Sequence, residues 1–160
     1  MEPVRNDTTA DRRTAVELAK RLLVDSIWRT AKIEVDGVTF PDTQEIFDGR
    51  APEGMSVDDI VTVNNIKRAW RFLLDNIDYP VDWQYIREYN RIIGEGLVRD
   101  AGRLREYGVR IGGTGWVPEI PTLESSQERV RGILEESEGE DTAMLLFGAV
   151  TREQWFSDGN

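Results

Sequence analysis

The sequence contains neither cysteine nor histidine among its 160 residues. The absence of cysteine excludes disulfide bonds, thiolate nucleophiles and zinc–thiolate sites. The absence of histidine removes the usual general base at neutral pH and the commonest protein ligand of transition metals. Serine–histidine and cysteine–histidine catalysis are therefore excluded as well.

The sequence also lacks any apolar run long enough to cross a bilayer. Residues 1–7 (MEPVRND) lack the apolar core of a signal peptide. We therefore expect a cytoplasmic protein with no membrane partner. The content of 39% hydrophobic and 31% charged residues is that of an ordinary globular protein rather than a disordered one.

Basic residues are too few to form a nucleic-acid surface. The chain has 20 Lys and Arg against 30 Asp and Glu, a net charge of −10, whereas phosphate backbones are bound by clustered basic side chains. The densest acidic stretch, residues 135–141, is interpreted as a solvated loop between two helices, with its last acids at the next helix N-terminus. The alternative, a metal-binding acidic loop, fits no EF-hand spacing.

Apolar residues recur at helical spacing over most of the chain, which predicts a mainly α fold. The stripes predict helices over residues 11–33, 56–77, 82–97, 123–136 and 141–154. Between the first two, Pro41 suits the first turn of a short helix that Gly49 can end. Ser56 with Asp59 resembles a capping box, and Asp82 can cap the helix that follows Pro80.

The helical spacing of apolar residues is interrupted between Tyr107 and Pro118. Apolar residues there flank the glycine-rich run 112–115, a pattern typical of a β-hairpin with a glycine turn. The residues alone thus predict a helical bundle with one inserted β-hairpin.

The last five residues, FSDGN, follow an apolar helix. Gly159 and Asn160 both tolerate positive φ, so their backbone N–H groups can point at one anion. Asp158 beside them could hold Mg²⁺ next to a bound phosphate. The alternative is a plain helix C-cap with Asp158 in solvent.

Residues 154–160 (QWFSDGN) resemble the beginning of the Fic motif, His-Pro-Phe-x-(Asp/Glu)-Gly-Asn, matching at Phe156, Asp158 and the final Gly-Asn pair. Residues 101–118 are similar to the Gly-Arg-x-Arg…Val-x-Ile segment and flap hairpin of the same family. Residues 30–34 (TAKIE) resemble its inhibitory (Ser/Thr)-x-x-x-Glu helix, and residues 38–49 resemble the segment after it. The chain is therefore identified as a member of the Fic (Fido domain) family.

The resemblance implies a Fic-type helical bundle and two parts: residues 1–35, an N-terminal helix with the inhibitory motif, and residues 36–160, a Fic-like domain that is incomplete at its C-terminal end. Most members of the family transfer AMP from ATP to a hydroxyl of a target protein, so ATP, Mg²⁺ and an unidentified target protein are the implied partners. A homodimer is left open.

The resemblance also implies a role for each matched residue. Asp158 holds the metal, Gly159 and Asn160 form the phosphate turn, and Glu34 with Thr30 belongs to the inhibitory helix. The flap that docks the target comprises Ile111, Gly112, Gly113, Thr114, Gly115, Trp116 and Val117. Phe156 is expected to pack in the core, and an exposed helix-end position is the alternative for Glu34.

Two departures from the motif predict that this chain is weak or inactive in AMP transfer. Gln154 stands where the family has its base, and a carboxamide accepts no proton at neutral pH. Losing a positioned base typically costs about two to four powers of ten in rate. Nothing after Asn160 supplies the motif's last Arg. Three alternatives stay open: Gln154 orients a water or hydroxyl, the protein is a non-catalytic binding or regulatory module of toxin–antitoxin type, or it is an unrelated helical interaction domain.

Overall fold

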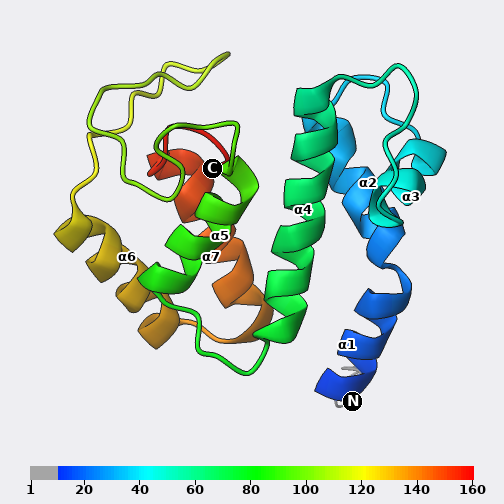
Figure 1. Ribbon diagram of the computed structural model, residues 1–160. Coiled ribbons are helices and arrows are strands. Elements are labelled where there is room, and N and C mark those ends of the chain that lie inside the picture. Colours follow the sequence, from blue (N-terminus) through cyan, green and yellow to red (C-terminus); the bar gives the residue numbers. More distant parts are fainter. Residues whose placement is uncertain (1–10) are drawn as a thin grey trace, which may run out of the picture.

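The computed structural model describes residues 11–160, which form seven helices and no strand (Figure 1). The prediction of a mainly α fold is confirmed. Residues 1–10, which carry the expectation about the N-terminus, lie outside the described residues. No helix in the described part is long and apolar enough to cross a membrane.

The long helix α4 (Val57–Asp75) lies between two groups of helices (Figure 1). On one side it packs against α2 (Leu23–Glu34) and the short α3 (Phe40–Phe47), and α1 (Arg12–Arg21) precedes α2. Their buried apolar residues form a first core cluster: Leu23, Ile27, Ala31, Val35, Val38, Ile46, Val63, Ile66 and Leu74. The predicted boundary after residue 35 falls inside this cluster, and the two-part division stays a prediction.

On its other side α4 packs against α5 (Trp83–Gly94), which also contacts α6 (Leu123–Glu136). The last helix, α7 (Gly139–Glu153), packs against α6. A second core cluster lies among these elements and consists of Trp83, Val130, Ile133, Ala149, Trp155 and Phe156. The chain after α7 therefore contributes two large aromatic side chains to the core.

The predicted helix starts are confirmed by their caps. The Ser56 hydroxyl accepts from the backbone N–H of Asp59 at 3.1 Å, and the Asp82 carboxylate accepts from that of Tyr85 at 2.8 Å. Pro41 lies in the first turn of α3, and Gly49 follows that helix with a φ of 87°. These local polar contacts satisfy backbone groups that the first turn of a helix leaves unpaired.

Several helix boundaries differ from expectation, and α5, for example, ends at Gly94 rather than at Leu97. The stripe over residues 11–33 is divided between α1 and α2 at Leu22, although no proline or glycine stands there to cause the break. The acidic stretch is mostly helical, because α6 continues to Glu136 and α7 begins at Gly139. Glu140 and Asp141 lie in the first turn of α7, as expected from the favourable field of a helix N-terminus.

The prediction of a β-hairpin between residues 107 and 118 is wrong, since no strand forms there. Only the turn is kept: the N–H of Ile111 donates to the carbonyl of Trp116 at 3.4 Å, and Gly113 has a φ of 73°. Three exposed glycines leave few side chains to pair across the turn, and Pro118 has no N–H for a ladder.

Loss of the α4 cap should destabilise the protein. Because Ser56→Ala leaves the N–H of Asp59 without its acceptor, we expect the free energy of unfolding to fall by about 1 kcal/mol. Ser56→Thr keeps the acceptor and also the hydroxyl that donates to the Asp59 carboxylate at 2.7 Å, so it should be nearly neutral. Urea unfolding followed by circular dichroism measures both, and equal losses in the two variants would contradict a capping role.

Candidate functional site

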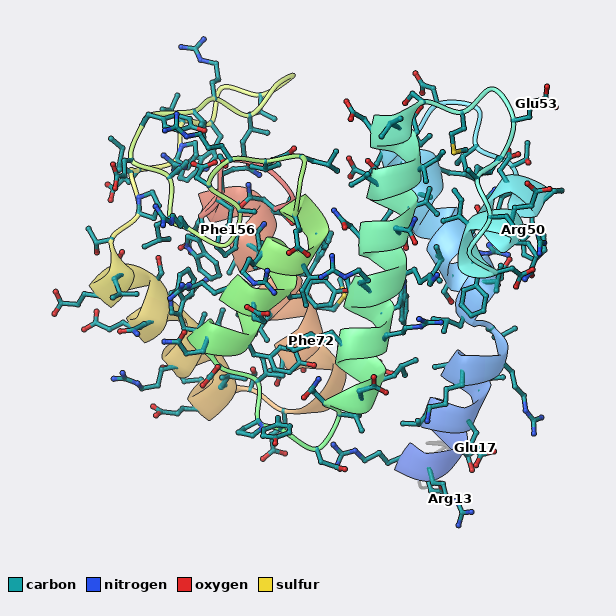
Figure 2. The ribbon with its side chains drawn as sticks, viewed as in Figure 1. Arg13, Glu17, Arg50, Glu53, Phe72 and Phe156 are labelled. Carbon is teal, nitrogen blue, oxygen red and sulfur yellow. The ribbon has the colours of Figure 1, made fainter. Side chains whose placement is uncertain are left out.

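The segment after α7 turns back into the molecule at Gln154. This residue caps α7 in the left-handed region, with φ 50° and ψ 59°. Trp155 and Phe156 then pack on Trp83 of α5. The Phe156 ring stacks on the Trp83 ring with 5.8 Å between centroids, and the Trp155 ring meets the Trp83 ring edge-on at 5.3 Å. Phe156 is labelled in Figure 2 in the half of the molecule that α5, α6 and α7 build. Its predicted place in the core is confirmed.

A buried arginine holds this returning segment in place. Arg105 is only 1% exposed, and its side chain donates only to backbone carbonyls. Its nitrogens donate to the carbonyls of Gln154 (2.5 Å), Tyr107 (2.6 Å), Glu119 (2.5 Å) and Glu153 (3.2 Å). Burial lowers the pKa of Arg105, yet a guanidinium stays charged at any physiological pH. Its positive charge therefore lies at the C-terminus of α7, where the helix dipole favours a cation.

Asn90 on α5 fixes the end of the same segment. Its Nδ2 donates to the carbonyls of Asp158 at 2.8 Å and Gly159 at 3.2 Å. Its Oδ1 accepts from the N–H of Gly102 at 2.8 Å. One buried carboxamide thus joins the chain end to the loop that follows α5.

The Asp-Gly-Asn turn is closed by its own side chains. Asn160 accepts from the N–H of Phe156 and donates to its carbonyl, both at 2.8 Å. The Asp158 carboxylate accepts from the N–H of Gly159 at 2.8 Å, and its side chain is exposed. Gly159 has a φ of 66°, which favours glycine. The turn is therefore closed by hydrogen bonds among residues 156–160.

Glu34, the last residue of α2, lies beside the Asp-Gly-Asn turn. Together with Asp158 and Gly159 it lines a pocket of about 110 Å³ that α4 and α5 complete. These residues are far apart in sequence, and the packing of α2, α4 and α5 brings them together. Thr30 does not line this pocket, and its hydroxyl donates to the carbonyl of Ser26 at 2.9 Å.

Asp158 fits the role of a single magnesium ligand. Residues 11–160 contain no group of three or more acidic side chains that could hold a metal by themselves. Magnesium, however, is commonly held by one or two carboxylates together with phosphate oxygens and water. An exposed carboxylate beside a turn of backbone N–H groups supplies the protein's part of that arrangement.

Gln154 is used structurally at the end of α7. Its Nε2 donates to the carbonyl of Thr151 at 2.7 Å, and it does not line the pocket of Glu34 and Asp158. The neighbouring Glu153 accepts from Arg129 at 3.1 Å and from Trp155 at 2.9 Å. Neither side chain is placed as a free base in this pocket.

The predicted flap residues lie against the end of α7. Trp116 donates its indole N–H to the carbonyl of Arg152 at 3.0 Å, and the Arg152 guanidinium lies 4.2 Å from the centre of that ring. Ile111, Thr114 and Trp116 line a shallow recess of about 400 Å³ on this side of α7. The remaining flap residues, Gly112, Gly113, Gly115 and Val117, are exposed.

Sequence reasoning missed Asn90 and gave Arg105 no role. Asn90 carries a usable signal, because it lies between Ile86 and Ile93 at helical spacing and so falls on the apolar face of α5. A polar residue on a buried face must find partners. Arg105 carries no comparable signal, since most arginines are exposed.

No protein-family model matches the chain, and no curated protein sequence is significantly similar to it.

Gly102 is the glycine on which the loop after α5 depends. It has a φ of 73°, and a Cβ there would lie 2.7 Å from the Cβ of Arg91. We expect Gly102→Ala to lower the free energy of unfolding by about 1–3 kcal/mol through strain and steric overlap. Gly108→Ala is the matched control, because its φ is not left-handed and nothing lies within 4 Å of the added carbon. Urea unfolding should separate the two variants, and equal stability would show that the loop adapts freely.

Proposed function

We propose that this protein is Fic-like and binds ATP with Mg²⁺ at the Asp158–Asn160 turn, with weak or no AMP transfer. The observation that carries the proposal is that Glu34 and the turn line one pocket. Each belongs to a different segment that resembles the family. Their meeting in space is what an inhibitory helix next to a phosphate turn requires.

The turn supplies the chemistry for phosphate binding. Gly159 presents a backbone N–H that already donates to a carboxylate, and a phosphate oxygen is a similar anionic acceptor. Asp158, once released from that contact, is free to bind the metal. Bound Mg²⁺ would neutralise part of the charge of the phosphates.

Glu34 opposes nucleotide binding in two ways. Its carboxylate adds a negative charge to the pocket that already holds Asp158, and like charges near a phosphate weaken its binding. The pocket of about 110 Å³ is also smaller than the roughly 300–1,000 Å³ of typical ligand sites. A nucleotide therefore needs Glu34 to move aside, as expected of an inhibitory residue.

The side chain of Gln154 favours the second candidate function, a non-catalytic nucleotide-dependent binding or regulatory module of toxin–antitoxin type. Its carboxamide accepts no proton, and its Nε2 is engaged by the carbonyl of Thr151. Glu153, the nearest carboxylate in sequence, is held by Arg129 and Trp155. Without a base for the target hydroxyl, binding can persist where transfer is slow.

Incubation with ATP labelled in its α-phosphate should give little or no labelled protein. We expect a rate at least about a hundredfold below that of an enzyme with a positioned base. Autoradiography of the chain alone and of a cell lysate measures self-labelling and target labelling. Strong labelling that disappears in Asp158→Ala would overturn the inactive assignment and support the enzyme.

Removing either of two carboxylates should change the nucleotide affinity, but in opposite directions. Glu34→Gln removes only the charge, and we expect it to tighten ATP·Mg²⁺ binding about three- to tenfold, or roughly 0.7–1.4 kcal/mol. Asp158→Ala should weaken binding about tenfold in the presence of Mg²⁺ and have little effect in EDTA. Isothermal titration calorimetry measures both variants.

The matched control is Glu53→Gln, which removes the same charge at the outer edge of the α2–α3 half of the molecule (Figure 2). Its affinity should stay within about twofold of the unchanged protein, because Glu53 is exposed and does not line the pocket, and salt screens exposed charges. If Glu34→Gln and Glu53→Gln change affinity equally, the effect is one of net charge and the inhibitory role fails. If no variant binds ATP, the proposed function itself fails.

A further inference from the structure

Helix α7 is apolar on most sides but is covered on only one. Ala149 is its single buried residue, while Met144 and Phe147 are 66% and 65% exposed. Leu145 is exposed as well. A helix that is hydrophobic all round is normally buried, and within residues 11–160 nothing covers this face. Exposed apolar surface of this kind marks an interaction site.

The exposed face has the spacing of a helix-pairing stripe. Glu140, Met144, Phe147 and Thr151 follow one another at intervals of four, three and four residues, which is the a/d spacing of paired helices. Gly148 beside this stripe is small and permits a close approach of a second backbone.

The apolar surface continues on both sides of Phe147. On one side, Phe147 lines the recess of about 400 Å³ below Trp116. On the other, it lines an apolar groove of about 480 Å³ between α5 and α7, which Tyr89 also lines. The face is therefore wider than one helix, as a stable interface of about 800 Å² per partner requires.

The charges of α7 select the orientation of a partner helix. Glu140 and Asp141 lie in its first turn, and Arg152 lies in its last. An antiparallel copy of the same helix brings Arg152 next to the acidic first turn at both ends, whereas a parallel copy places like charges side by side. Helix dipoles favour the antiparallel arrangement too.

We propose that this face binds a second copy of the chain, with the two α7 helices antiparallel. Phe147 packs against Met144 of the second copy, and Glu140 lies opposite Thr151 of the second copy. Such a contact is isologous and closes after two chains. It depends on the exposed face of α7 and not on nucleotide binding.

The oligomeric state tests the interface directly. Analytical ultracentrifugation should give a dimer at about 50 μM, and Phe147→Glu should weaken dimerisation at least about tenfold. Val57→Glu is the matched control, because Val57 is 75% exposed at the start of α4 and gains the same charge. Circular dichroism should show that both variants stay folded.

Disulfide trapping tests the orientation, and the absence of native cysteine makes it unambiguous. Two single variants, Glu140→Cys and Thr151→Cys, should crosslink to each other when mixed under oxidising conditions. Neither should crosslink to itself, because eleven residues of helix, roughly 16 Å, separate the like positions of an antiparallel pair and a disulfide spans less than about 7 Å between Cα atoms.

Each contrary outcome overturns the proposal. A chain that stays monomeric at about 100 μM leaves the face to a different occupant, such as a helix of another protein. A dimer that Phe147→Glu does not weaken uses another surface. Self-crosslinking of Glu140→Cys means that the helices run parallel.

Discussion

The buried guanidinium of Arg105 is the interaction on which the candidate site depends. A charge in the interior is costly unless it is hydrogen-bonded, and here each of the three guanidinium nitrogens donates to at least one of four backbone carbonyls. Two of them, Glu153 and Gln154, are the last carbonyls of α7, which lack partners within the helix. Arg105 thus provides donors for the carbonyls at the end of α7, and the chain can turn inward at Gln154 without leaving these two carbonyls unpaired.

The position of the Asp-Gly-Asn turn follows from that constraint in two further steps. The inward turn lets Trp155 and Phe156 stack on Trp83, which fixes the segment against α5. Asn90, one turn beyond Ile86 on the same helix, then takes the carbonyls of Asp158 and Gly159. Since α5 packs on α4 and α4 on α2, the end of α2 with Glu34 lies at the turn. A rigid path of buried contacts therefore links two carboxylates from distant parts of the chain.

Local sequence signals predicted the helices well, because helix caps and the helical spacing of apolar residues involve only residues that are close together in the sequence. Ser56, Asp82 and Pro41 begin helices where the sequence said they should. The same reasoning failed between residues 107 and 118, since a strand needs a partner of matching side chains and glycines supply none. For the candidate site, the turn at Gly159 could be predicted from its composition. The clamps by Asn90 and Arg105 could not, because all their carbonyl partners except that of Tyr107 are more than a dozen residues away in sequence.

Helix α7 connects the two proposals physically. Its last carbonyls hold Arg105, and its exposed side lines the groove that Gly159 and Asn160 also line. A second copy seated on Phe147 would lie beside the proposed phosphate turn, so the two proposed binding events take place at neighbouring residues. Coupling between two binding events is reciprocal. If a bound second copy changes the affinity for nucleotide by some factor, bound nucleotide must change the affinity for the second copy by the same factor. This holds although the two events depend on different contacts.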